Sequence, residues 1–383
     1  MISKYLKFIY NTWVIVSTSI LLNFVQFLIY LVYLFVDKVL KLKPSAQKIR
    51  QFIARSCQIF TNNFIYLIGL DEQSVIVSGE EICPSESCLV LINHRHHADF
   101  IYIFLVSALL KLQDNQKCFL KDILKYVPVI GPTNLAAGCC FLKRSLAKDA
   151  VKITEYFKNL MESTKKSDSN NFCFVTFIEG TRITEEKRIF SNQMAQQKFG
   201  LKPLQHLLQL KPAGYQLIQK TVKFQVPTYF VTLLFQRNGE KTYDKVGPTL
   251  FDLLSGEHSK LGKIHIQFKR FYNDDSSDIV KSLNDEWQEI DYEIEEFNKN
   301  GRFSSPKADL LKDNSIYQKS RFTFYVSSVV SIFFAKILAY EVFSKMSWWS
   351  INFILLCSCF LMLLARRLSD PSKSSKILIE KGK

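Results

Sequence analysis

Residues 88–100 read CLVLINHRHHADF, an apolar run that ends abruptly in a cluster of polar side chains. The run 88–92 has the length and composition of a buried strand. His94 follows this run, and Asp99 stands five residues further on. Residues five apart on one helix point about 140° away from each other, so we expect His94 in a turn and Asp99 in the first turns of the next helix. From there a carboxylate can orient the imidazole that takes a proton from a hydroxyl.

A second polar turn follows a second apolar run. Residues 172–176 read FCFVT, and residues 177–182 read FIEGTR. Six histidines and 35 acidic residues make a spacing like that of His94 and Asp99 common by chance, so the second turn matters. Ligands of open α/β sheets gather at the carboxyl ends of the strands. The two turns are therefore predicted to form one site.

The rest of the chain alternates between strand and helix patterns, which predicts an α/β fold. We expect strands near 74–78, 88–92, 172–178, 226–235 and 263–271. We expect helices near 98–112, 146–163, 203–220 and 279–297, and a polar loop over 165–171.

Four sequence blocks stand in a fixed order along the chain. The first is Asn93-His94-Arg95 followed by Asp99, and the third is 177–182. Between them lie YVPVIG and FLKRS, and a fourth block, VPT, begins a later apolar strand; these are residues 126–131, 141–145 and 226–228. The four blocks resemble those of the glycerolipid acyltransferases, whose best-known members are the lysophosphatidic acid acyltransferases. The resemblance covers roughly residues 70–300 and is greatest to the eukaryotic multi-span branch, which includes 1-acylglycerol-3-phosphate and lysocardiolipin acyltransferases.

Two positions depart from the pattern of that family. Ile178 stands where many members have proline, although the multi-span branch accepts other residues there. Residues 210–215 read LKPAGY, where that branch usually carries a basic pair before a glycine and an aromatic residue. Lys211 is kept and Ala213 stands at the other position, which leaves the acceptor head group open.

The resemblance implies a mixed sheet flanked by helices, and a reaction that uses acyl-CoA as co-substrate without a further cofactor or a metal. His94 would be the general base, oriented by Asp99, that lets the free glycerol hydroxyl of a lysophospholipid attack the thioester. Lysophosphatidate, giving phosphatidate, is the first choice of acceptor. No serine or cysteine stands in a Gly-x-Ser-x-Gly elbow, so no acyl-enzyme is expected. Cys173 lies in the middle of a predicted strand and is interpreted as a core residue.

Phosphate binding is predicted at the second turn. Arg182 can bind a phosphate through two parallel hydrogen bonds, and the backbone N–H groups of Gly180 and Thr181 can add to this contact. Glu179 is expected to fix the loop or Arg182. The predicted substrate-binding residues are Asn93, Arg95, Lys143, Arg144, Glu179, Gly180, Thr181 and Arg182.

Metal and nucleic-acid functions are disfavoured by the residue pattern. His96 and His97 beside His94 imitate part of the histidine box of membrane di-iron enzymes, but the other three histidines are scattered. We interpret His96 and His97 as surface positions on the first helical turn. The nine cysteines form no Cys-x2-Cys pair, and we interpret them as reduced thiols. The net charge of +15 comes without a zinc finger or RNA-recognition motif, which favours anionic lipid surfaces and phosphorylated substrates over nucleic acid.

Three apolar segments predict insertion into a membrane. Residues 12–36 contain no charged residue, and 25 positions exceed the roughly 20 needed for a helical span. A cleaved signal peptide is the alternative, but its apolar region is shorter. Residues 322–343 and 348–365 predict a transmembrane hairpin, with a buried soluble helix pair as the alternative. The predicted divisions are a membrane anchor, a catalytic domain, a linker, the hairpin and a basic tail, over 1–50, 51–300, 301–320, 321–365 and 366–383.

Basic residues follow the first and last predicted spans, which places the catalytic domain and the tail on one cytosolic or matrix-facing side. We expect the endoplasmic reticulum membrane, with the mitochondrial inner membrane as the alternative. Two function classes remain: an acyltransferase, or an accessory subunit that keeps the fold, binds lipid and joins partner subunits in a membrane complex. The complete set of blocks favours the enzyme.

Overall fold

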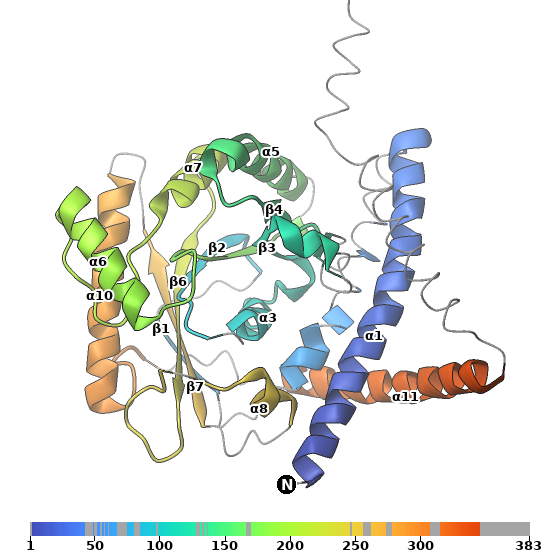
Figure 1. The fold of residues 1–383 in the computed structure, drawn as a ribbon. Helices are drawn as coiled ribbons and strands as arrows, with labels where there is room; N and C mark the ends of the chain where they lie inside the picture. Colours follow the sequence, from blue (N-terminus) through green and yellow to red (C-terminus); the bar gives the residue numbers. More distant parts are fainter. Residues whose placement is uncertain are drawn as a thin grey trace, which may run out of the picture.

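A computed structural model shows a mixed sheet at the centre of the molecule, with helices around it (Figure 1). The structure describes residues 2–42, 75–79, 85–96, 99–127, 137–165, 170–245, 247–255, 262–272, 278–306 and 315–344, together with isolated positions and short stretches within 49–66 and 131–135.

Seven strands of the described chain form this sheet in the order β1-β7-β6-β2-β5-β3-β4. Their bounds are β1 Val75–Gly79, β2 Cys88–Ile92, β3 Gln116–Lys121, β4 Cys140–Leu142, β5 Cys173–Phe177, β6 Thr228–Gln236 and β7 Lys263–Phe271. Neighbours run parallel except β6 and β7, which are antiparallel. The carboxyl ends of β2, β5, β3, β4 and β6 therefore all point to the same edge.

Helices cover both faces of the sheet. Those that pack on or beside it are α3 Asp99–Leu109, α5 Leu146–Thr164, α6 Glu185–Phe199, α7 Pro212–Val222, α8 Leu250–Leu254 and α10 Ile279–Asn300. Two longer helices are α1 Ile2–Leu34, continued by a π-helical turn over Phe35–Val39, and α11 Ser315–Ser344. Short 3₁₀ helices span Gln113–Asn115 and Asp122–Tyr126.

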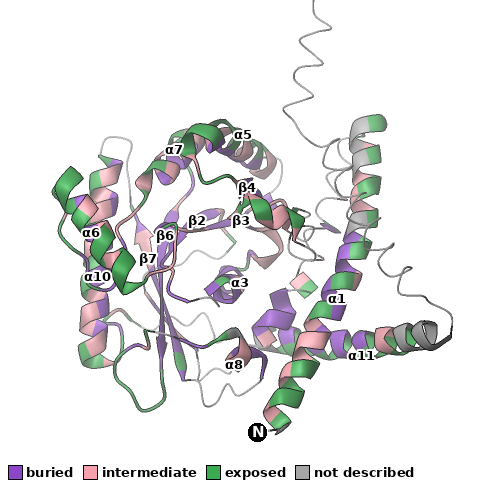
Figure 2. Ribbon diagram, in the orientation of Figure 1, coloured by how far each residue is buried: buried purple, intermediate pink, exposed green. Residues whose placement is uncertain are grey.

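Strand β2 joins two hydrophobic cores because its side chains alternate between the faces of the sheet. Val90 and Ile92 belong to the core that α3 covers. Leu89 and Leu91 belong to the core under α5, α7 and α10, which includes the fully buried Trp287. Each large apolar side chain buried in this way contributes about 1.5–3 kcal/mol to stability. Figure 2 shows the buried strands between partly exposed helices.

The structure confirms the predicted mixed α/β fold and most of its elements. Strands β2 and β7 have the predicted bounds, and β1, β5 and β6 differ from them by one or two residues. The helix predicted over 203–220 is wrong in its first half, because 201–211 is irregular and α7 begins only at Pro212. Strands β3 and β4 and helix α6 were not predicted. Helix α11 begins at Ser315, inside the range predicted as a linker.

Over residues 17–26, the polar side chains of helix α1 lie on its buried side. Ser17 is fully buried, and its Oγ donates to the Oγ of Ser331 on α11 at 2.8 Å. Thr18 lies 3.2 Å from the same hydroxyl. The exposed side of α1 is apolar and includes Phe24 and Val25, which are about half exposed. Polar contacts between helices with apolar outer faces are typical of helices packed within lipid.

One helix of the described chain, over Ser3–Tyr33, is long and apolar enough to cross a bilayer. Residues 322–343 of the predicted hairpin lie in α11, while 348–365 and the tail lie outside the described residues. Asn11 on α1 donates to the carbonyl of Leu254 in α8 at 2.6 Å, which joins α1 to the sheet domain.

Candidate active site

His94 and Asp99 meet at the carboxyl end of β2, as their spacing predicts. The Nδ1 atom of His94 lies 2.9 Å from Oδ2 of Asp99, the first residue of α3. The same oxygen accepts the backbone N–H groups of Arg95 at 2.6 Å and His96 at 2.8 Å. A carboxylate accepts but does not donate, so the imidazole proton lies on Nδ1. The lone pair of Nε2 is then available for a proton.

Glu179 holds the backbone of His94 from the opposite side. Its Oε2 accepts the N–H of His94 at 2.6 Å, and its Oε1 accepts the N–H of Leu208 at 2.8 Å. The carbonyl of His94 accepts from the N–H of Ile183 at 2.9 Å. The imidazole stacks on the ring of Phe177, with 3.9 Å between centroids and 19° between planes. These contacts join the turns after β2 and β5 into one site.

Burial strongly perturbs the carboxyl group of Glu179. Its side chain is 1% exposed. Burial raises the pKa of Glu179 from 4.5 to about 7, against the lowering effect of the N–H groups of Leu208 and His94 and of the charge on Arg95. The nearby charge of Asp99 raises this pKa further. Glu179 therefore titrates close to neutral pH, where its two accepted hydrogen bonds depend on the charged form.

The raised pKa of Glu179 gives an expected pH dependence of stability. Between pH 4.5 and about 7 the folded chain holds a proton that the unfolded chain has lost. The contribution of Glu179 to the free energy of unfolding therefore falls as pH rises through this window, by up to about 3 kcal/mol. The Glu179→Gln variant should lack this slope in denaturant unfolding. The exposed Glu289→Gln variant should keep it, and an unchanged slope in Glu179→Gln would contradict the assignment.

The turn after β5 gathers positive charge. Gly180 has φ +72°, a conformation that favours glycine, and a Cβ built there would lie 3.2 Å from Nζ of Lys211. Lys187 donates to Oγ1 of Thr181 at 3.1 Å and to the carbonyl of Arg182 at 3.0 Å. Arg182 is half-buried, and its side chain has no hydrogen-bond partner within the described part of the chain. Three cations thus surround one turn beside His94, in a position to bind an anion.

Two predicted substrate-binding residues have partners inside the protein instead. Asn93 is 1% exposed, and its amide both donates to the carbonyl and accepts from the N–H of Leu233 on β6, at 3.0 and 2.7 Å. Arg95 is buried, donates to the carbonyl of His206 at 2.7 Å, and lies 4.2 Å above the ring of Tyr243. Both side chains brace the turn around His94, so this geometry does not favour a direct substrate contact for either.

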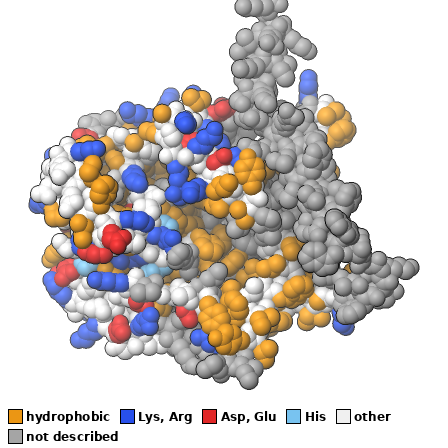
Figure 3. Space-filling view, in the orientation of Figure 1, with side chains coloured by type: hydrophobic (Ala, Val, Ile, Leu, Met, Phe, Trp, Pro, Cys, Tyr) orange, Lys and Arg blue, Asp and Glu red, His pale blue; other side chains and the backbone are white. Residues whose placement is uncertain are grey.

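Lys143 and Arg144 lie at the carboxyl end of β4, on the same edge of the sheet as His94. Both are exposed, and Arg144 has φ +63°. Asp149 of α5 accepts the backbone N–H groups of Lys143 at 3.1 Å and Ser145 at 3.0 Å, which fixes this loop. Their substrate contacts stay predictions. Figure 3 shows lysine and arginine side chains around histidine side chains on one face of the molecule.

The expected surface position of His96 is wrong. His96 is 7% exposed, and a Cβ added to Gly247 would meet its ring at 2.5 Å. His97 lies outside the described residues. Within the described chain, no group of three or more His, Cys, Asp or Glu side chains is placed to hold a metal ion.

Cys173 is fully buried opposite Cys88 in the sheet, which confirms its interpretation as a core residue.

The site also contains residues that the sequence analysis did not assign to it. Lys211 was visible as a basic residue just before a proline, and Phe177 as the residue paired with Ile92 if β2 and β5 are neighbours. The N–H of Leu208 left no signal in the sequence, because it contributes only a backbone group.

Comparison with known proteins finds similarity to acyltransferases. A family model described as Acyltransferase matches residues 74–230, which run from β1 into β6 and include both turns. The chain is 25% identical over 260 residues to 1-acyl-sn-glycerol-3-phosphate acyltransferase delta of Mus musculus, covering 67% of this chain and 63% of that one. It is 27% identical over 251 residues to the protein of that name from Homo sapiens, covering 65% and 62%. It is 26% identical over 152 residues to lysocardiolipin acyltransferase 1 of Danio rerio, covering 39% and 37%. These matches span less than two thirds of the length of each relative, and they confirm the resemblance seen in the sequence.

Proposed function

We propose that this chain is an acyl-CoA-dependent acyltransferase that acylates the free glycerol hydroxyl of a lysophospholipid, converting lysophosphatidate to phosphatidate. The observation that carries this proposal is the His94–Asp99 pair, 2.9 Å apart, beside the turn that holds Arg182. Among the described residues, the side chain of Arg182 has no hydrogen-bond partner. The names of the relatives support a glycerolipid acceptor.

The reaction follows from the tautomer of His94. Its Nε2 takes the proton of the glycerol hydroxyl as the oxygen attacks the thioester carbonyl of acyl-CoA. A new C–O bond forms, the C–S bond breaks, and the proton passes from Nε2 to the CoA thiolate. Asp99 accepts the Nδ1 hydrogen bond throughout and stabilises the transient imidazolium. No covalent acyl-enzyme and no further cofactor takes part.

The phosphate of the acceptor binds at the turn after β5. Arg182 can form two parallel charge-assisted hydrogen bonds with phosphate oxygens, and Gly180 and Thr181 can offer backbone N–H groups. Lys211 adds a third donor, because its side chain lies against Gly180. Lys211 is the member of the family's usual basic pair that this chain keeps, and Ala213 stands at the other position.

Removing the charge of Lys211 should weaken binding of the acceptor. We expect Lys211→Ala to raise the KM for lysophosphatidate about 3- to 10-fold, with little change in the KM for acyl-CoA, because an exposed charged hydrogen bond is lost. Lys220→Ala is the matched control, since Lys220 is an exposed lysine on α7. Steady-state kinetics with each substrate varied in turn would measure both constants. An unchanged KM for lysophosphatidate would remove Lys211 from the site.

The acceptor and the donor reach this site from a lipid surface. The apolar helix over Ser3–Tyr33 would anchor the chain in the bilayer, and the net charge of +15 would favour anionic head groups. We place the protein in the endoplasmic reticulum membrane, with the mitochondrial inner membrane as the alternative. Organelle fractionation of a tagged chain would separate them.

A CoA-release assay tests the proposed function. The chain is purified in detergent without partners and given acyl-CoA with lysophosphatidate, lysocardiolipin or another lysophospholipid. We expect release of CoA with lysophosphatidate, because His94, Asp99 and Arg182 all belong to one chain. If no acceptor supports turnover while a lysolipid still binds, the chain is an accessory lipid-binding subunit instead.

A further inference from the structure

We propose that Asp291 on α10 is a positioning residue for the proposed acyl transfer. It acts through the segment 204–208, which we call the strap. The strap is irregular backbone between α6 and α7, and it contacts both residues that brace His94. This inference rests on the proposed function and adds to it a residue far from the reacting atoms.

Helix α10 holds the strap through three hydrogen bonds. Asp291 is 7% exposed, and its two carboxylate oxygens accept the backbone N–H groups of Gln205 and His206, each at 2.8 Å. The indole N–H of Trp287, one turn earlier on α10, donates to the carbonyl of Leu208 at 2.9 Å. A carboxylate that accepts two backbone N–H groups forms strong charge-assisted bonds in a buried setting.

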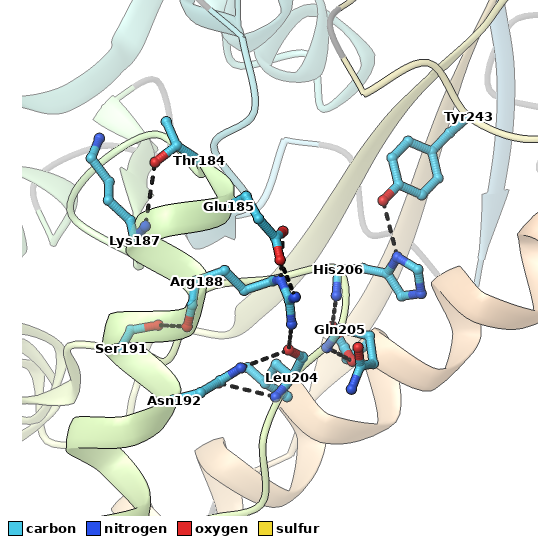
Figure 4. A network of polar contacts seen from close by, with 11 residues as sticks. Thr184, Glu185, Lys187, Arg188, Ser191, Asn192, Leu204, Gln205, His206 and Tyr243 are labelled. Atoms are coloured by element: carbon cyan, nitrogen blue, oxygen red, sulfur yellow. Dashed lines mark hydrogen bonds and ion pairs between the residues drawn. The ribbon is translucent and has the colours of Figure 1, made fainter.

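Helix α6 holds the beginning of the strap. The side-chain amide of Asn192 donates to the carbonyl of Leu204 at 2.8 Å, and its Oδ1 accepts the N–H of Leu204 at 3.0 Å. Arg188 donates to the same carbonyl at 2.8 Å. Figure 4 shows the strap passing between these side chains and the His206–Tyr243 contact.

From this fixed position the strap reaches the catalytic turn twice. The carbonyl of His206 accepts from Arg95, the residue after His94, at 2.7 Å. The N–H of Leu208 donates to Glu179 at 2.8 Å, and the other oxygen of Glu179 accepts the N–H of His94 at 2.6 Å. Hydrogen bonds at both ends of the strap, joined by its covalent backbone, therefore connect Asp291 to the backbone of His94.

The rate of proton transfer depends on where this backbone holds the imidazole, because small misplacements of a catalytic group are costly. The position of α10 along the sequence, about 200 residues after His94, explains why no local pattern revealed Asp291. The strap has no reacting group of its own, so its effect passes entirely through Arg95 and Glu179.

Asp291→Asn keeps the size of the side chain but turns one acceptor into a donor that faces a backbone N–H. We expect kcat to fall about 10- to 100-fold with both KM values within about twofold. Glu289→Gln is the matched control, because Glu289 is an exposed acid on the same helix and should leave kcat unchanged. A loss confined to KM, or equal losses in the two variants, would overturn the proposal.

The pH profile gives a readout that loss of stability alone would not move. The charged groups facing Glu179 are Arg95 and Asp99, and the N–H of Leu208 lowers its pKa. A loosened strap weakens that hydrogen bond and so raises the pKa of Glu179, whose charged form accepts the N–H of His94. The acid limb of the kcat profile should therefore lie at higher pH in Asp291→Asn than in the wild-type chain. An unmoved limb would count against the strap.

Hydrogen exchange separates this inference from the proposed function, since it requires no turnover. Mass spectrometry of Asp291→Asn should show faster exchange both in the strap and in residues 93–96, while Glu289→Gln shows neither. Faster exchange in the strap alone would overturn the proposal, whatever the wild-type chain does with acyl-CoA. If Asp291→Asn does not fold, Trp287→Phe removes one hydrogen bond to the strap and should give the same two signals.

Discussion

Replacing His94 with alanine is expected to slow acyl transfer by about 10²–10⁴-fold, the usual contribution of a positioned general base. Asp99 occupies the Nδ1 side of the ring, so Nε2 is the ring nitrogen that can take the proton. Single-turnover release of CoA measures this loss directly. Asp99→Asn should cause a loss of similar size, since the amide no longer fixes the Nδ1 tautomer.

The control for Asp99→Asn is Asp285→Asn, an exposed acid on α10. Thermal unfolding of each variant shows whether the loss of rate comes from misfolding. Near-native turnover by folded His94→Ala would remove the general-base mechanism, and near-native turnover by Asp99→Asn would remove only its orienting role.

Replacing Arg182 with alanine is expected to raise the KM for lysophosphatidate about 10- to 100-fold, because a charge-assisted contact worth roughly 1.5–3 kcal/mol is lost. Arg182→Lys should recover only part of this, since an ammonium cannot form the planar pair of bonds. The KM for acyl-CoA should stay close to that of the wild-type chain. Arg302→Ala, at an exposed arginine, is the matched control.

The two substrates make this prediction specific. If Arg182→Ala raises both KM values equally, the turn after β5 binds a group that the donor and acceptor share, or it supports the fold. If only the KM for acyl-CoA rises, the turn binds the phosphates of CoA, and the acceptor site lies elsewhere.

The pairing of His94 with Asp99 was predictable because it is local. Five residues separate the two, and an apolar strand before them fixes where the turn must lie. The contact between His94 and Glu179 could not be predicted, because it joins residues 85 positions apart and depends on the pairing of β2 with β5. Sequence patterns report which residues follow strands, but not which strands are neighbours.

The partners of Arg95 within the protein could not be read from its residue type. An arginine beside a histidine proposed as general base suggests a contact with substrate, and here its charge faces a backbone carbonyl and an aromatic ring.

The helix predicted over 203–220 is wrong in the strap for a related reason. Its backbone N–H groups bond to Asn192, Asp291 and Glu179 rather than to one another, so side chains distant in sequence replace the helical bonds. Pro212 was the one local warning, because the residue before a proline avoids the helical region.

Helix α6 was missed although its ends were readable. Thr184 caps its first turn, Glu185 and Glu186 follow, and Gly200 ends it with φ +65°. Only Asn192 and Ala195 are buried along it, so the apolar periodicity that reveals a helix is missing.

The hydrogen bonds between Ser17, Thr18 and Ser331 join two helices, α1 and α11, that are synthesised at different times. Ser331 on α11 is synthesised 314 residues after Ser17, its partner on α1. During that interval the hydroxyl of Ser17 can still donate to the carbonyl of Trp13, one turn earlier on the same helix, at 2.6 Å. Helix α1 can therefore complete its packing against α11 only after all seven strands of the sheet have been synthesised.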